Sequence, residues 1–211
     1  MGLKNAYLEI AAQAVSLLDV PEVAASWEQP SALARWAVGG LAGHLAYQIF
    51  SVDPALEEPA SEREPISVLE HYARAAWIDA PLDGEISSGI RAKGEAVSSE
   101  GARRLVERAE AAVGRQRTRL GEVPGDRVVF MPQTGWALAL DDFLLTRMVE
   151  LAVHMDDLAV SVSLRMPTLP GAAFDPVLGL LTGLAAQRHG QAVLLRALTR
   201  AERGSSAVNV F

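Results

Sequence analysis

The sequence predicts an all-α protein built on about four core helices, an arrangement typical of a helix bundle. Apolar residues recur at intervals of three and four, first over residues 3–18, which indicates an amphipathic helix. Residues 37–52 are apolar nearly all round, so this second helix is expected at the centre of the molecule. Only one short stretch, near residue 130, is rich in the β-branched residues typical of strands.

The other expected elements follow from the same periodicity and from the positions of glycine and proline. In chain order, the first are a proline-bounded loop over 53–65, a helix from Pro65 through Trp77, and a mostly helical segment over 85–120 with interruptions near Gly94 and Gly101. A hairpin is expected to pair 127–131 with 136–140. A long helix over 142–163 follows, with Asp141 and Asp142 as N-cap candidates, and then helices over 174–189 and 191–200. We expect three regions: a helix bundle over 1–165, a C-terminal helical extension over 166–203 packed on it, and a flexible tail over 204–211.

Composition narrows the classes of function. The 211 residues suit a single domain, and half of them are hydrophobic. The net charge of −7 argues against binding to nucleic acid or to an anionic membrane. The longest apolar stretch, 38–50, is too short to span a membrane, and nothing at the N-terminus resembles an export signal, so we expect a cytoplasmic protein. The glycine-rich loops typical of nucleotide sites are absent from the sequence.

The chain contains no cysteine. Disulfides, zinc–thiolate sites and a cysteine nucleophile are therefore excluded. If this protein carries out thiol chemistry, the thiol must come from another molecule.

The strongest chemical signal is the pair Glu150 and His154 on the predicted long helix. Residues four apart leave a helix on one face, about 6 Å apart along its axis. Their neighbours are apolar, which suits a position facing the interior, where a carboxylate and an imidazole can bind one divalent metal. The same spacing also fits an ordinary surface pair that contributes a few tenths of a kcal/mol.

His44 is the second signal, because it lies in the most apolar helix of the chain. A buried imidazole without a partner costs roughly 1–3 kcal/mol. One hydrogen bond in the core would satisfy it, and so would a metal shared with Glu150 and His154 on a facing helix. Two histidines and one glutamate leave a fourth position open, as in catalytic zinc sites.

Three other residues bear on this candidate site. Asp157, three residues after His154, is expected to accept the second imidazole N–H and fix its tautomer. His71 is expected at a solvated or rim position on a mixed helix, and His189 at a helix end. We leave both of these histidines out of the site.

Two motifs resemble a known family. The segment from Trp27 to Ala46, WEQPSALARWAVGGLAGHLA, is similar to the N-terminal domain of the mycothiol-dependent maleylpyruvate isomerase family, within the DinB/YfiT-like superfamily. The segment from Asp142 to Ala159, DFLLTRMVELAVHMDDLA, resembles the helix of that family with the pattern Arg-x-x-Glu-x-x-x-His-x-x-Asp-Leu-Ala. The ending RALTRAER is similar to the C-terminus of actinobacterial members.

The resemblance implies a fold and a site. The superfamily fold is an up-down-down-up four-helix bundle. Family members bind a catalytic metal, usually zinc, through the residues that match His44, Glu150 and His154, and they use the thiol mycothiol as isomerases or S-transferases. By superfamily analogy a homodimer is plausible.

The resulting hypothesis is a metal-dependent, mycothiol-using transferase or isomerase in which a metal-bound thiolate attacks a small electrophile. Arg147, one turn before Glu150, is a candidate to orient Glu150 or a substrate carboxylate, although a plain surface arginine fits as well. Two alternatives stay open. One is a metallohydrolase that uses zinc-bound water, and the other is a non-catalytic helical binding or stress-response protein.

Overall fold

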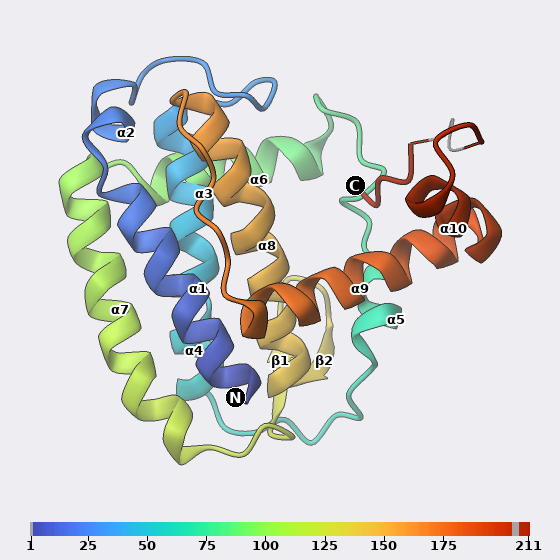
Figure 1. Ribbon diagram of the computed structural model, residues 1–211. Helices are drawn as coiled ribbons and strands as arrows, with labels where there is room; N and C mark the ends of the chain where they lie inside the picture. The colour runs from blue at the N-terminus through green and yellow to red at the C-terminus, as the bar shows by residue number, and fades with distance from the viewer. Residues whose placement is uncertain (1, 204–206) are drawn as a thin grey trace.

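The computed structural model describes residues 2–203 and 207–211. Its core consists of four helices, α1 (Leu3–Leu18), α3 (Val38–Phe50), α7 (Ala102–Glu122) and α8 (Leu140–Ser161). In Figure 1, α1 runs up, α3 and α7 run down, and α8 runs up again. Both α7 and α8 pack against α1 and α3. This arrangement confirms the predicted all-α, up-down-down-up bundle.

The bundle is held by apolar side chains at the expected spacings. Tyr7 and Ile10 of α1, Leu41 and Leu45 of α3, and Leu144 of α8 are fully or almost fully buried. Burying such a side chain stabilises the fold by about 1.5–3 kcal/mol. The core therefore fixes α3 against α8, the two helices that carry the candidate ligands.

A buried amide joins three of these helices. The Tyr7 hydroxyl donates to Gln116 Oε1 at 2.8 Å, and Gln116 Nε2 donates to the Ile49 carbonyl oxygen at 2.9 Å. A third bond links Gln116 Nε2 to Asp53 Oδ1 at 3.0 Å. All polar atoms of the Gln116 amide thus have partners, as burial requires.

Short helices connect the core helices and differ in part from the predicted ones. They are α2 (Pro21–Ala25), α4 (Val52–Glu57), α5 (Val68–Ala73) and α6 (Glu85–Val97).

The predicted loop over 53–65 was wrong in its first part, which α4 occupies. The helix predicted from Pro65 begins only at Val68, because the Ser67 hydroxyl caps it by accepting from the Glu70 amide. Residues 65–66 instead lie beside the hairpin, where the Ile66 amide donates to the Ala137 carbonyl oxygen at 2.9 Å.

The helix α6 is continuous through Gly94, so the interruption predicted there was wrong, whereas Gly101 separates α6 from α7 as predicted. Gly94 is buried where α6 crosses α3. A Cβ atom on Gly43 would overlap the backbone oxygen of Gly94, and a Cβ on Gly94 would lie 2.6 Å from the Gly40 oxygen. Glycine therefore permits close helix approach here, directly beside His44.

The hairpin forms within the predicted segments, 127–131 and 136–140. Strands β1 (Val128–Met131) and β2 (Trp136–Ala139) pair antiparallel, and Gly135 in the turn has a φ of +85°. The following helix, α8, begins at Leu140 with Ala139 at the N-cap. The N-cap role predicted for Asp141 and Asp142 was therefore wrong. Both lie in the first turn, where negative charge is favourable.

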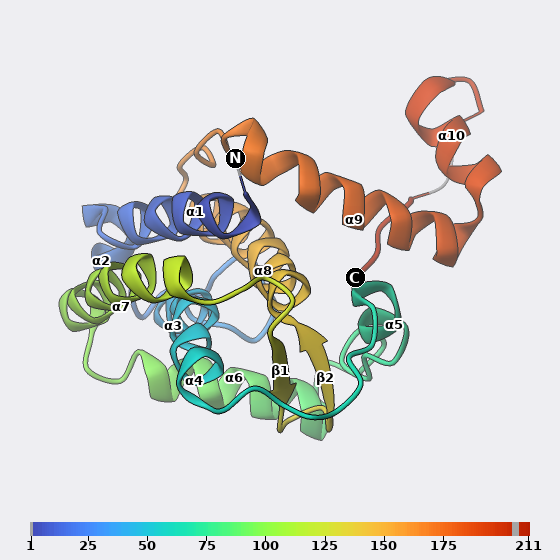
Figure 2. The same cartoon turned by 90° about the horizontal axis from the view of Figure 1, so that it is seen from below.

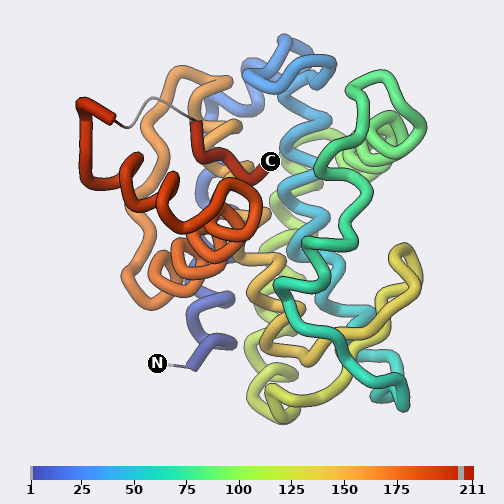
Figure 3. The backbone as a smooth tube through the Cα atoms, turned by 90° about the vertical axis from the view of Figure 1, so that its right-hand side faces the viewer, coloured from blue at the N-terminus to red at the C-terminus, as the bar shows by residue number. Residues whose placement is uncertain are grey.

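The C-terminal part forms α9 (Gly171–His189) and α10 (Gln191–Thr199), separated by Gly190 with a φ of +87°. Figure 2 shows α9 reaching from the bundle, with α10 at its far end. α9 packs on α1, α8 and α5, whereas α10 packs on α9. Of the predicted flexible tail, residues 204–206 lie outside the described residues. Residues 207–211 return toward α5 (Figure 3). There, the ring centroids of Tyr72 and Phe211 lie 5.8 Å apart.

None of the described helices is long and apolar enough to cross a membrane.

Candidate metal centre

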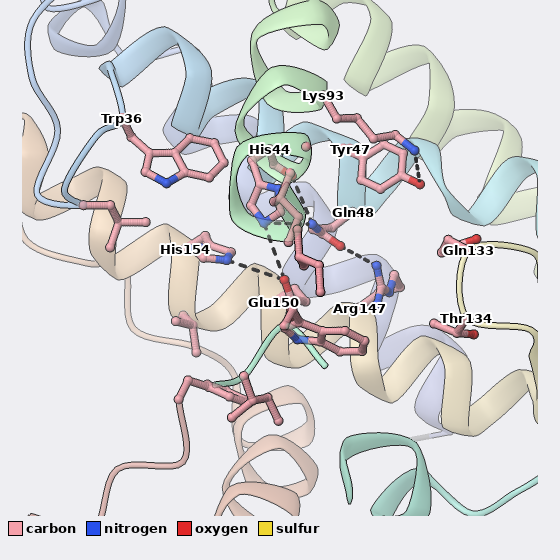
Figure 4. Close-up of a pocket in the computed structure, with 18 of the residues that line it drawn as sticks. Trp36, His44, Tyr47, Gln48, Lys93, Gln133, Thr134, Arg147, Glu150 and His154 are labelled. Carbon is pink, nitrogen blue, oxygen red and sulfur yellow. Dashed lines mark hydrogen bonds and ion pairs between the residues drawn. The ribbon is translucent and has the colours of Figure 1, made fainter. Parts of the chain in front are cut away.

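The three residues singled out by the sequence meet between α3 and α8 (Figure 4). His44 projects from α3, while Glu150 and His154 project from adjacent turns of α8. Their nitrogen and oxygen ligand atoms all lie within 4.8 Å of one another. His44 Nε2 lies 3.6 Å and His154 Nε2 lies 3.5 Å from the same oxygen, Glu150 Oε2.

This geometry fits a divalent metal. Ligands bonded to zinc at about 2.0–2.2 Å in a tetrahedral arrangement lie about 3.4 Å apart, close to the two distances from Glu150 Oε2. Imidazole nitrogen and carboxylate oxygen are ligands that zinc and related metals accept. The set supplies three ligands, which leaves coordination positions for a small molecule.

Burial shapes the protonation of these three side chains, which are only 12–19% exposed. Burial by itself raises the pKa of Glu150, but hydrogen bonding to His154 and His44 outweighs it and holds the pKa well below the ordinary value. Burial lowers the pKa of His44. Burial also opposes the charge on His154, yet hydrogen bonds to Asp157 and Glu150 raise its pKa to about 9.

Asp157 lies where the sequence places it. Its Oδ2 is 2.9 Å from His154 Nδ1. A carboxylate can only accept a hydrogen bond, so Nδ1 carries the proton in this contact. The other nitrogen of His154, Nε2, faces Glu150 and is the one that can bind a metal, which would replace its proton.

Gln48 and Arg147 form a second polar layer beside the three residues. Arg147 Nη1 donates to Gln48 Oε1 at 2.5 Å, and Arg147 Nε donates to the Thr146 hydroxyl at 3.2 Å. Gln48 is 1% exposed and donates to the His44 carbonyl oxygen at 3.1 Å. Sequence reasoning did not assign Gln48 to the site. The available signal was an amide one turn after His44 in an otherwise apolar helix.

A cavity of about 720 Å³ opens over these residues. His44, Glu150, His154, Arg147 and Asp157 all line it. Its volume is in the range of small-molecule sites. The Trp36 ring lies beside His44, with centroids 5.3 Å apart, and shields one side of that imidazole.

The solvated or rim position predicted for His71 was wrong. This residue is 2% exposed and also lines the cavity. The indole N–H of Trp136 donates to His71 Nδ1 at 3.1 Å, so the proton of the neutral ring is on Nε2. Burial, assisted by the charge of Arg147, lowers the pKa of His71 to about 4. The ring is therefore a neutral part of the cavity wall at pH 7.

This depressed pKa predicts a loss of stability in acid. Unfolded His71 has the ordinary pKa of 6.5, so below that pH the unfolded chain takes up a proton that the folded chain binds only near pH 4. Stability contributed by the neutral ring is present above pH 6.5 and lost as the pH falls toward 4. Between pH 7 and 4.5, His71→Gln should reduce the loss in free energy of unfolding by about 2 kcal/mol, measured by urea denaturation. The control His189→Gln, at the end of α9, should lose as much free energy of unfolding between pH 7 and 4.5 as the wild type. If His71→Gln also lost as much as the wild type, the prediction would be contradicted.

Comparison with known proteins places this chain in a family. The family model described as the mycothiol maleylpyruvate isomerase N-terminal domain matches residues 7–159, more than half of the chain. The chain belongs to this family. The matched region contains all four bundle helices except the ends of α1 and α8, and it includes His44, Glu150 and His154.

Two solved structures of mycothiol-dependent maleylpyruvate isomerases have a fold similar to that of this chain. A crystal structure of the mycothiol-dependent maleylpyruvate isomerase has a TM-score of 0.58 at 18% identity, over 92% of this chain and 73% of that one. A mutant of such an isomerase, with one histidine replaced by alanine, has a TM-score of 0.52 at 20% identity, over 89% and 71%. At these identities the likeness shows a shared fold. No curated protein that was compared matches the chain.

Proposed function

We propose that this protein is a metal-dependent transferase or isomerase that uses mycothiol as its thiol. The observation that carries the proposal is the meeting of His44, Glu150 and His154 at one cavity, in a chain of the mycothiol maleylpyruvate isomerase N-terminal domain family. Because the chain contains no cysteine, the reacting sulfur in this proposal is brought by a diffusible molecule.

His44, Glu150 and His154 would hold the metal, with zinc as the first candidate. When bound, a divalent metal supplies Lewis acidity that favours the deprotonated form of a thiol near neutral pH. Asp157 fixes the ring of His154 and keeps its Nε2 directed at Glu150. The cavity above them provides the space in which thiol and electrophile would meet.

Arg147 is proposed to orient the electrophile. Gln48 and Thr146 hold its guanidinium group at the cavity wall, one helical turn from Glu150. A guanidinium fixed in this way can bind a carbonyl or carboxylate oxygen without losing much side-chain entropy on binding. Its positive charge also helps to keep Glu150 ionised.

Metal analysis combined with a thiol-dependent assay tests the proposal. We expect about one divalent metal per chain, and consumption of an electrophile that requires both the metal and mycothiol. Hydrolysis by metal-loaded protein without any thiol would favour the metallohydrolase alternative instead. The absence of stoichiometric metal after reconstitution would contradict the proposal and favour a non-catalytic binding protein.

Asp157→Asn gives a prediction specific to the orienting contact. An amide can present its N–H to His154 Nδ1, which promotes the wrong tautomer and turns Nε2 into a donor. We expect the metal dissociation constant to rise about 10–100-fold, measured by competition with a chelator. The control Asp156→Asn alters the adjacent exposed carboxylate and should leave the affinity unchanged. Equal affinities for Asp157→Asn and wild type would show that Asp157 does not orient the ligand.

A further inference from the structure

The cavity over the candidate metal centre changes character toward its mouth. The three candidate ligands, which are 12–19% exposed, form its deep end. The more accessible wall is contributed by the segment from Trp77 to Ile90 and is largely apolar. The apolar residues of that wall are Trp77, Ile78, Ile86 and Ile90. Ile86 is 45% exposed, although a side chain of this kind is usually buried.

The charges along the cavity do not favour a highly charged ligand. The lining holds two cationic side chains, Lys93 and Arg147, against three carboxylates, Glu85, Glu150 and Asp157. Even with a divalent metal bound, the formal charge of this lining would be only +1. His71 adds a neutral ring to the same wall.

Both cations already donate hydrogen bonds to neutral groups of the protein. Lys93 Nζ lies 2.8 Å from the Tyr47 hydroxyl and 4.0 Å from the centre of its ring. Arg147 is bound to Gln48 and Thr146. Among the described residues that line the cavity, only these two are lysine or arginine, so the two negative charges of a dianion would exceed the formal charge of +1 that the lining would carry with a divalent metal bound.

From the apolar wall and the low formal charge of the lining we infer that the electrophile has an apolar, ring-sized body carrying at most one negative charge. Its polar group would lie toward Arg147 and the candidate metal centre, and its apolar body would lie against Ile86, Ile90 and Trp77. This inference rests on the proposed function and names the substrate class of that same site. It separates this protein from an enzyme that prefers maleylpyruvate, which carries two carboxylates.

An α,β-unsaturated ketone with an aryl group illustrates the chemistry. The thiol sulfur forms a bond to the β-carbon, while the π electron pair of the C=C bond moves toward the α-carbon and the carbonyl oxygen. The proton lost by the thiol ends on the α-carbon. The product is a thioether, and nothing is oxidised or reduced in the net addition. After rotation about the bond between the α- and β-carbons, which is single in the adduct, loss of the α-proton and of the thiolate would return the isomerised alkene and the thiol.

A binding experiment tests the apolar wall without activity. Benzylacetone is a neutral, unreactive aryl ketone, and adipate is a dianion of comparable length. Because Trp36 and Trp77 line the cavity, a bound ligand is expected to change tryptophan fluorescence. We expect benzylacetone to bind at least about tenfold more tightly than adipate, both with and without zinc, since an apolar contact contributes on the order of 1–2 kcal/mol.

A matched pair of variants locates the binding. Ile86→Ser removes an exposed apolar side chain from the cavity wall, and Leu198→Ser removes one from α10, where Leu198 is 65% exposed. We expect Ile86→Ser to weaken benzylacetone binding about five- to tenfold and Leu198→Ser to leave it unchanged. Equal effects of the two substitutions, or tighter binding of adipate than of benzylacetone, would overturn the inference.

Turnover separates this inference from the proposed function. With zinc and mycothiol present, we expect kcat/KM for benzalacetone to exceed that for maleylpyruvate at least tenfold. A preference for maleylpyruvate would overturn the inference while supporting the proposed function. If benzylacetone binds at the Ile86 wall but mycothiol promotes turnover of neither electrophile, the proposed function fails and the apolar ligand class is still supported.

Discussion

Glu150→Gln is expected to abolish stoichiometric metal binding and to lower mycothiol-dependent activity about a thousandfold or more. Glu150 Oε2 is the atom toward which both His44 Nε2 and His154 Nε2 point. An amide has nearly the same shape but lacks the negative charge, and its NH₂ group can turn toward one of the imidazoles. Since a metal ion can contribute several kcal/mol to transition-state stabilisation, its loss corresponds to at least this factor.

Elemental analysis and a single-turnover assay on the same preparations check this prediction. The control Glu95→Gln alters an exposed glutamate of α6 and should retain both metal and activity. Circular dichroism would establish that Glu150→Gln is folded, because the substituted side chain is largely buried. A folded Glu150→Gln variant with wild-type metal content would show that the carboxylate is not a ligand.

Gly43→Ala is expected to lower the free energy of unfolding by about 2–3 kcal/mol and to weaken metal binding as well. The added Cβ overlaps the Gly94 backbone oxygen of α6 and would lie 2.9 Å from the Ser98 side chain. Backbone cannot rotate away as a side chain can, so α6 must move off α3. His44 is the next residue on α3, and its position should shift with that movement.

Thermal unfolding provides the measurement, with an expected decrease in Tm of about 5–10 °C for a chain of this size. Gly114→Ala is the matched control, because a Cβ at that helical position of α7 has open space around it. It should raise stability by up to about 1 kcal/mol, as alanine favours helix. Similar stability of Gly43→Ala and Gly114→Ala would show that the contact between α3 and α6 is not as tight as described.

Helix geometry explains why much of the candidate site could be predicted from the sequence. Residues four apart on a helix share a face, so Glu150 and His154 could be paired without knowledge of the fold. His44 could be joined to them because a histidine in a nearly all-apolar helix requires a partner. Asp157 followed from the same periodicity. These inferences depend on regular backbone geometry within one helix and on the bundle that places two helices face to face.

The parts that could not be predicted depend on contacts between distant segments. His71 is buried because α5 lies beside the hairpin, where Trp136 donates to its ring. A helix of six residues provides too little periodicity to reveal such a contact. The low helix propensity of Gly94 predicts an interruption of the helix, but α6 is continuous there. A glycine occupies this position because the backbone of α3 approaches it closely. In both cases tertiary packing outweighed the local preference.

The floor and the walls of the cavity belong to different kinds of segment. His44, Glu150 and His154 are carried by bundle helices, whereas the apolar wall comes from the connection between α3 and α7, and Met131 from the hairpin before α8. Connecting segments tolerate substitution better than helices that share a core. Under the proposed function, the accepted electrophile could therefore change through mutations in these connections while His44, Glu150 and His154 stay fixed.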